Sequence, residues 1–318
     1  MRLSMARTRL ETALYRLLDR LYLPLDRAFI RRTRNLRLLP GAAERTGGKF
    51  SYAEWAHVIG IFQTLLWLHL RDKRDNQILD VGCGTGLMGI AAEPFLGPQG
   101  RYVGLDVNTG ELEFCRRHYP SPPFEYVHLD VNNPAYARHQ TIERQRWPLE
   151  DARFDVVTAL SVWTHLNEKD ALFYFAEICR VLKPGGKAIV TFFLLDAPYH
   201  DGLGRRSEAQ GRYHMTSQDR WVFDQSAYGS DAWFHPRWVS VPETAMGVSL
   251  AGLDRLMAHA GLTLVEHHQG NWKEEPGAYF RNILVFQKGL AGRGTAAAEP
   301  DPMKDQSDCG PAKSAVGH

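Results

Sequence analysis

The feature that most constrains the fold of this chain is a run of glycines directly after a short apolar segment. Gln77–Val81 is typical of a buried strand, and Gly82, Gly84 and Gly86 follow it at alternate positions. Glycine lets the backbone turn sharply and lets a ligand approach the free N–H groups of the following helix. The run therefore predicts a strand, a ligand-binding turn and a helix in succession.

From this turn onward, short apolar segments alternate with segments of helical periodicity. Such alternation with short connections is typical of an α/β fold, a mostly parallel sheet sandwiched by helices. The predicted strands are 77–81, 101–106, 125–130, 154–160, 188–194, 262–267 and 280–287. The predicted helices are 86–96, 109–118, 167–182 and 249–259. A further helix is expected after Ser51, whose spacing from Glu54 fits a capping box.

Composition divides the chain into three parts. Residues 1–48 hold a basic amphipathic segment and a loop, and residues 49–288 hold the α/β domain. From residue 289 onward there are no aromatic residues, which predicts a disordered tail over 289–318. Residues 197–248 form an insertion with eight aromatic residues, which we interpret as a lid over the substrate or as the packing of a small subdomain.

The N-terminal segment concentrates the positive charge of the chain. Residues 1–39 carry ten Arg against three acidic residues, a charge of +7, so the remainder sums to −5 within the net charge of +2. Leucines at helical spacing predict an amphipathic helix, which Pro24 is expected to break or kink. Three interpretations stay open: a cap helix on the core, a helix on an anionic membrane surface or anionic substrate, and an organelle transit peptide.

The overall charge and the cysteines argue against several classes of protein. A net charge of +2 does not indicate a general nucleic-acid-binding surface. The four cysteines lack metal-ligand spacing, which predicts reduced thiols in a cytoplasmic protein with no metal site. His200, His214 and His235 also fit no common metal pattern. The most apolar stretch, residues 58–70, is shorter than the roughly twenty residues that a spanning helix needs.

Acidic residues at the ends of three predicted strands narrow the choice of ligand. Asp80 precedes the first glycine, which disfavours a pyrophosphate and favours a ligand with an amino group. Asp106 can accept hydrogen bonds from a ribose diol, and Asp130 suits an exocyclic amine. An amino acid, a diol and an adenine amine together describe S-adenosylmethionine. Residues 84–89 also fit the dinucleotide pattern GxGxxG, so an NAD-dependent oxidoreductase stays as the alternative.

Taken together, these motifs resemble the class I S-adenosylmethionine-dependent methyltransferase family. Residues 80–86, DVGCGTG, match its DxGxGxG loop, and residues 182–186, LKPGG, match the turn before its fifth strand. Over about residues 50–288, the resemblance implies a Rossmann-like seven-stranded sheet with the last strand antiparallel. Residues 161–166 and 270–272 further resemble a bacterial branch often linked to the methylation of sugars or other small molecules.

The resemblance also implies which residues contact the cofactor. They are Asp80, Gly82, Cys83, Gly84, Gly86, Asp106, Val107, Asp130, Val131 and Ser161. Several have a structural alternative: the glycines as helix–strand packing, Asp80 as an acceptor for backbone N–H groups, Asp106 as a helix N-cap and Asp130 as the start of a polar loop.

The predicted activity is methyl transfer to a small molecule or glycan, on oxygen rather than nitrogen. Residues 160–163, LSVW, replace the (Asp/Asn)-Pro-Pro-(Tyr/Phe) motif typical of methylation at nucleobase or amide nitrogens. His165 is the candidate general base, because an imidazole with a pKa near ~6.5 suits proton uptake; the alternative is a histidine bonded to the backbone at a helix start. A non-catalytic cofactor-binding protein is the rival from another class.

Overall fold

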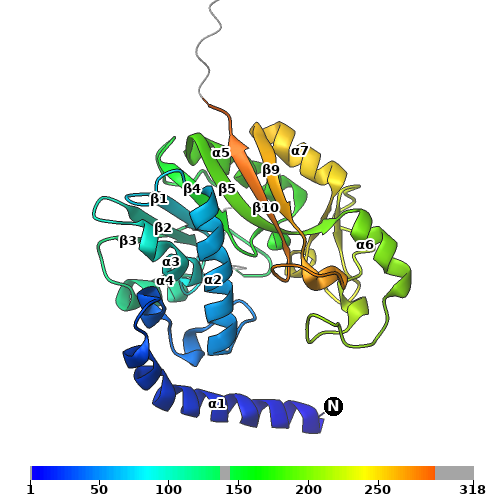
Figure 1. The fold of residues 1–318 in the computed structure, drawn as a ribbon. Helices are drawn as coiled ribbons and strands as arrows, with labels where there is room; N and C mark the ends of the chain where they lie inside the picture. Colours follow the sequence, from blue (N-terminus) through cyan, green and yellow to red (C-terminus); the bar gives the residue numbers. More distant parts are fainter. Residues whose placement is uncertain (1, 137–143, 291–318) are drawn as a thin grey trace, which may run out of the picture.

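A twisted sheet forms the centre of the computed structural model, which describes residues 2–136 and 144–290 (Figure 1). Its main strands follow the order β3–β2–β1–β4–β5–β10–β9, and β10 runs antiparallel to both of its neighbours. They are β1 (Gln77–Val81), β2 (Arg101–Asp106), β3 (Phe124–His128), β4 (Phe154–Ala159), β5 (Leu182–Leu195), β9 (Leu262–His268) and β10 (Asn282–Lys288). The predicted Rossmann-like α/β fold, mostly parallel with an antiparallel last strand, is confirmed.

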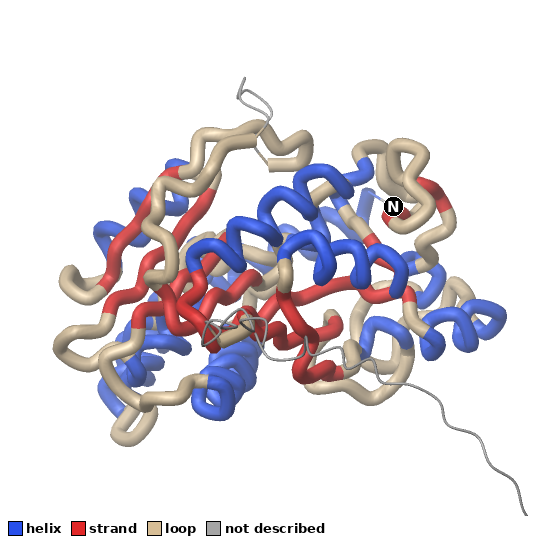
Figure 2. Tube along the Cα trace, turned by 90° about the horizontal axis from the view of Figure 1, so that it is seen from above, coloured by secondary structure: helices blue, strands red, loops and turns tan. Residues whose placement is uncertain are grey.

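Helices cover both faces of this sheet (Figure 2). On one face lie α2 (Tyr52–His69), α3 (Leu87–Ala92) and α4 (Thr109–His118), and on the other α5 (Glu168–Val181) and α7 (Leu250–Ala260). Each face has its own buried apolar cluster, as expected for a sheet packed on two sides. The predicted capping box is present, since the Ser51 side chain accepts from the backbone of Glu54 and the Glu54 carboxylate accepts from that of Ser51.

The aromatic insertion adds three short strands that the sequence analysis missed. They are β6 (Gln225–Ser226), β7 (Trp233–His235) and β8 (Gly247–Ser249). β8 pairs in parallel with the last residues of β5, so the insertion grows out of the carboxyl end of that strand. Strands of two or three residues leave no alternation to detect. The insertion also contains α6 (Ala197–Gly202), and its apolar residues pack with Phe193 of β5 and with Trp272 in a small core.

The N-terminal segment forms one long helix, α1 (Arg2–Phe29). Pro24 was expected to break or kink this helix, and it does not break it, because α1 continues to Phe29. A proline inside a helix removes one hydrogen bond, and on an exposed helix the freed carbonyl can be solvated by water. No helix among residues 2–136 and 144–290 is long and apolar enough to cross a membrane. The predicted tail lies, from residue 291 on, outside the described residues.

Candidate functional site

The glycine turn after β1 is tied to the end of β2. The backbone N–H groups of Gly82 and Cys83 donate to the Leu105 carbonyl, at 2.7 and 3.2 Å. The N–H of Gly84 donates to Asp106 Oδ2 at 2.8 Å. These bonds bring the predicted loop and the predicted second-strand acid to one place at the carboxyl edge of the sheet, where ligands of such folds bind.

Two positions in the turn require glycine. Gly86, directly before α3, has φ +89°, and a Cβ there would lie 2.4 Å from Cε2 of Tyr119. Gly82 has φ +68°, and a Cβ there would lie 2.5 Å from Cγ2 of Val162. Side chains rarely adopt such positive φ angles, and real Cβ contacts are not this short. The second contact also places the turn beside the segment that follows β4.

The acids at the ends of β2 and β3 differ in their surroundings. Asp106 accepts from Gly84 and, through Oδ1, from the N–H of Asn108 at 2.9 Å. Asn108, not Asp106, caps α4, because its side chain accepts from two N–H groups of the first turn. Burial raises the pKa of Asp106. Asp130 is exposed and Val131 is buried, so the third-strand acid is open to a ligand.

Cys83 in the turn and Asp80 just before it have largely structural contacts. Cys83 is buried, and a hydrogen bond with Cys115 together with burial raises the pKa of its thiol well above the ordinary value. Asp80 is 1% exposed, and its two carboxylate oxygens accept from the hydroxyls of Tyr102 and Thr158, at 2.7 and 2.8 Å. Burial raises the pKa of Asp80 to about 7. These contacts favour the structural alternative for Asp80, with side-chain hydroxyls in place of backbone N–H groups.

Replacing Asp80 by asparagine is expected to flatten the pH dependence of the free energy of unfolding. Because the pKa of the folded carboxyl lies near 7 against an ordinary value of 3.8, the folded state keeps a proton that the unfolded chain releases. The stability from this group is complete below about pH 4 and is lost as the pH rises toward about 7, by on the order of 4 kcal/mol. Urea titrations of Asp80→Asn at several pH values measure the change in slope.

The matched control for this experiment is Asp254→Asn, at an exposed position on α7. It is expected to keep the wild-type slope. Identical slopes for Asp80→Asn and the wild type would contradict a protonated carboxyl in the folded core.

The segment after β4 turns sharply at Ser161, which has φ +68°. Its N–H donates to Thr191 Oγ1 on β5 at 2.7 Å, and its hydroxyl accepts from Nη1 of Arg281 at 2.7 Å. Ser161 therefore joins the end of β4 to the start of β10. Its neighbour Val162 contacts the glycine turn, so the predicted Ser161 lies next to the predicted cofactor loop.

His165 is held between two oxygen atoms. Its Nδ1 lies 2.8 Å from the carbonyl oxygen of Glu243, and its Nε2 lies 3.1 Å from the hydroxyl of Tyr136. A carbonyl only accepts, so Nδ1 carries the hydrogen and Nε2 is the acceptor. Burial, together with the positive charge of Arg281, lowers the pKa of His165 to about 4. The imidazole is therefore neutral at physiological pH, with its free nitrogen facing a hydroxyl.

Arg281, at the amino end of β10, is a functional candidate that the sequence analysis missed. Its guanidinium stacks near Phe193 and Phe280, at 5.0 and 5.9 Å from the ring centroids. Its buried Nε has no hydrogen-bond partner, and among residues 2–136 and 144–290 no carboxylate pairs with it. Its charge also lowers the pKa of His165. The sequence feature that could have indicated Arg281 is a single positively charged residue directly before an otherwise apolar strand.

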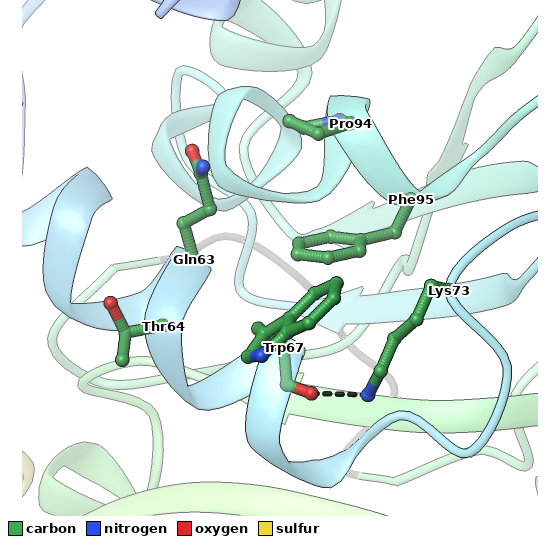
Figure 3. Close-up of a pocket in the computed structure, with 6 residues that line it drawn as sticks. All are labelled: Gln63, Thr64, Trp67, Lys73, Pro94 and Phe95. Carbon is green, nitrogen blue, oxygen red and sulfur yellow. Dashed lines mark hydrogen bonds between the residues drawn. The ribbon is translucent and has the colours of Figure 1, made fainter.

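One hollow and one group of metal-ligating side chains lie away from this site. The hollow in Figure 3 is lined by Trp67, Lys73 and Phe95 and adjoins the amino end of β1, where Asn76 donates to Phe95. A group formed by His69, Glu266 and His268 has its ligand atoms within 4.8 Å of one another. In the described part of the chain, His200, His214 and His235 form no such group.

The sheet order, the glycine turn and the acid at the end of β2 define a class I S-adenosylmethionine-dependent methyltransferase domain. The family described as a methyltransferase domain matches residues 79–190 of this chain. S-adenosylmethionine is the family's cofactor. The exposed Asp130 at the carboxyl edge of the sheet is open to the adenine amine of this cofactor.

Three curated relatives illustrate the similarity. The demethylmenaquinone methyltransferase of Symbiobacterium thermophilum is 33% identical over 36% of this chain and 41% of its own length. The phthiotriol/phenolphthiotriol dimycocerosates methyltransferase 1 of Mycobacterium ulcerans is 29% identical over 42% and 43%. The fatty-acid O-methyltransferase of Mycolicibacterium smegmatis is 31% identical over 38% of each chain. The chain thus spans less than half the length of these relatives.

Among solved structures, an S-adenosylmethionine-dependent methyltransferase from Methanosarcina mazei is 18% identical, with a TM-score of 0.47 over 71% of this chain and 97% of that one. A methyltransferase from Mesorhizobium loti has the same TM-score at 14% identity, over 71% and 96%.

Proposed function

We propose that this chain transfers the methyl group of S-adenosylmethionine to an ionisable oxygen of a small molecule, such as a phenol, an enol or a carboxylic acid. The observation that carries the proposal is Arg281, a guanidinium with no carboxylate partner in the described chain, bonded to Ser161 and next to His165. A cation in this position lowers the energy of a negatively charged nucleophile.

The proposed chemistry is a single displacement. When bound, S-adenosylmethionine supplies a methyl group that is activated by its positive sulfur. The site must hold the acceptor oxygen about 3 Å from the methyl carbon, in line with the sulfur. An O–CH₃ bond then forms, the C–S bond breaks with its electrons passing to sulfur, and S-adenosylhomocysteine is the second product. Arg281 holds the acceptor oxygen while it carries negative charge.

His165 has a limited role in this scheme. Its unprotonated Nε2 can accept a proton from the acceptor, directly or through the hydroxyl of Tyr136. A pKa of about 4 makes it a weak base, so it cannot deprotonate a neutral alcohol efficiently. This argument favours acceptors that ionise readily and disfavours the unmodified hydroxyls of a neutral glycan. His165 remains a candidate base, and the proposal depends mainly on the positive charge of Arg281.

The names of the relatives agree with acceptors of this kind. One methylates a fatty acid on oxygen, and another acts on demethylmenaquinone. In a ring that carries a phenol, an ionised oxygen also activates the neighbouring carbon, so the same cation would serve C-methylation. The position of the methyl group in the product distinguishes the two outcomes.

The test begins with binding and then measures turnover. Calorimetry with S-adenosylhomocysteine and with NADH is expected to give binding for the first only. S-adenosylhomocysteine release is then measured by mass spectrometry for a panel of phenols, hydroxyquinones, fatty acids, uronic-acid glycans and neutral glycans. We expect turnover with acidic acceptors, above that with neutral alcohols of matched size. Binding without turnover on any acceptor would favour the non-catalytic alternative, and a preference for neutral glycans would contradict the role of Arg281.

A further inference from the structure

The N-terminal helix exposes an apolar stripe that the folded chain does not use. Between residues 10 and 29 of α1, the large apolar side chains that follow helical spacing are 44% to 73% exposed. They are Leu10, Leu14, Leu17, Leu18, Leu21, Tyr22, Leu25 and Phe29. Outside α1, the exposed large apolar residues of the described chain occur singly or in pairs. A continuous exposed stripe of this kind marks an interaction surface.

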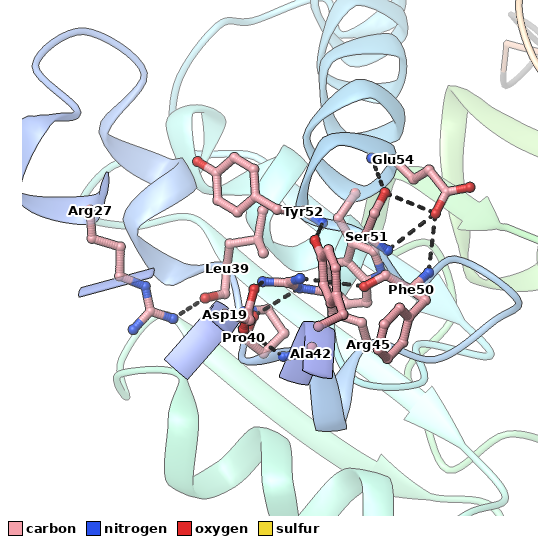
Figure 4. A network of polar contacts seen from close by, with 12 residues as sticks. Asp19, Arg27, Leu39, Pro40, Ala42, Arg45, Phe50, Ser51, Tyr52 and Glu54 are labelled. Atoms are coloured by element: carbon pink, nitrogen blue, oxygen red, sulfur yellow. Dashed lines mark hydrogen bonds and ion pairs between the residues drawn. The ribbon is translucent and has the colours of Figure 1, made fainter. Parts of the chain in front are cut away.

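α1 attaches to the rest of the protein through a different face (Figure 4). Asp19 pairs with Arg45 at 2.8 Å and accepts from the N–H of Ala42 at 3.0 Å. Leu23 is buried, and the Tyr15 hydroxyl accepts from the N–H of Tyr52 at 2.9 Å. These contacts orient the helix and leave its leucine stripe directed away from the core. The interpretation as a cap helix therefore accounts for the anchoring face only.

The same helix is positively charged. Arg9, Arg16 and Arg20 are exposed, and within the described residues none of them pairs with a carboxylate. Of the three acidic residues of α1, Asp19 is neutralised by Arg45, and Glu11 and Asp26 are exposed. An exposed apolar stripe with exposed arginines on the other side of the helix, of which Arg16 lies over the ring of Phe50, is the amphipathic pattern of a helix that lies in the surface of a membrane rich in anionic lipids.

We propose that α1 docks this protein onto an anionic lipid membrane, with the leucine stripe in the acyl boundary and the arginines at the lipid phosphates. A second copy of the chain is the alternative occupant of the stripe, and it would leave the exposed arginines without an anionic partner. The docking does not depend on the proposed reaction.

α1 is connected to the glycine turn of the candidate cofactor site through the residues that follow it. Beyond the Asp19–Arg45 pair, the chain reaches Thr46, whose hydroxyl lies 3.2 Å from that of Thr85 in the glycine turn. Figure 1 shows α1 along the lower edge of the molecule, with its C-terminal end nearest to α3 and α4. A docked helix therefore holds the cofactor loop close to the lipid surface.

The test is sedimentation of the full chain with vesicles. We expect it to bind vesicles of phosphatidylglycerol and phosphatidylcholine about 100-fold more tightly than vesicles of phosphatidylcholine alone, since each of three arginines contributes about 1 kcal/mol. Salt at about 0.5 M is expected to abolish most of this difference. Leu17→Glu combined with Leu21→Glu is expected to abolish binding to both kinds of vesicle.

Leu250→Glu, at a half-exposed position on α7, is the matched control and is expected to bind like the wild type. Calorimetry with S-adenosylhomocysteine verifies that each variant is folded, and it separates loss of docking from failure of the proposed function. Equal binding of the Leu17→Glu/Leu21→Glu variant and the wild type would overturn the proposal. So would a wild-type dimer in light scattering that the double variant converts to monomer without any vesicle binding.

Discussion

Gly86→Ala is expected to destabilise the fold by about 2–5 kcal/mol and to weaken S-adenosylhomocysteine binding by about 100-fold. Two costs add. The residue has φ +89°, which strains any side chain, and its new Cβ would lie 2.4 Å from the ring of Tyr119. That ring is buried and its hydroxyl donates to the Thr85 carbonyl at 2.8 Å, so it cannot move without breaking a bond of the cofactor loop.

Urea unfolding and calorimetry measure the two effects separately. The control is Gly204→Ala, because no atom lies within 4 Å of a Cβ built there and its φ is not positive. Adding Tyr119→Leu to Gly86→Ala removes the overlap but not the backbone strain, so it is expected to restore only part of the loss. Wild-type affinity in Gly86→Ala alone would show that the turn does not hold the cofactor.

Arg281→Met is expected to lower kcat/KM for an acidic acceptor by about 100-fold, because the site loses the cation that favours the ionised form of the acceptor and holds its oxygen in position. Methionine keeps the packing near Phe193 and Phe280 while removing the charge. S-adenosylhomocysteine affinity is expected to stay within about threefold of wild type, a change below 1 kcal/mol. A large loss of affinity would instead assign Arg281 to the carboxylate of the cofactor.

A second readout does not depend on turnover. Arg281 contributes to the low pKa of His165, so its removal is expected to raise that pKa from about 4. NMR titration of the imidazole measures the shift, and Arg281→Lys, which keeps the charge, is expected to retain most of the low value. An unchanged pKa in Arg281→Met would place the guanidinium too far from His165 to act on the same ligand.

The regular part of the fold could be predicted from the sequence because its strands and helices are long enough to show a period. β1 and β2 begin and end where the sequence analysis placed them, and α5 begins directly after Asn167, whose side chain caps it. β5 extends further than predicted, since it includes the LKPGG segment and continues to Leu195. The continuation of α1 beyond Pro24 depends on exposure to water, which no local pattern encodes.

The candidate site was predictable only where one motif contains it. The glycine turn, Asp106 and Ser161 lie near one another in the structure as expected, since they follow neighbouring strands. Arg281 and Tyr136 come from segments far apart in the sequence, and only the pairing of β10 with β5 brings Arg281 to Ser161. Glu243 illustrates the same limit, because its carbonyl orients His165 across 78 positions of the chain.

The division of β5 between two sets of neighbours has an implication for engineering this protein. Its central residues pair with β4 and β10, whereas Phe193 to Leu195 pair with β8. The segment between β5 and β8, residues 196–246, therefore leaves the sheet and returns to it at neighbouring positions. Chimeras that exchange only residues 196–246 between relatives have two fixed junctions, so the insertion can be replaced without rebuilding the sheet that carries the glycine turn.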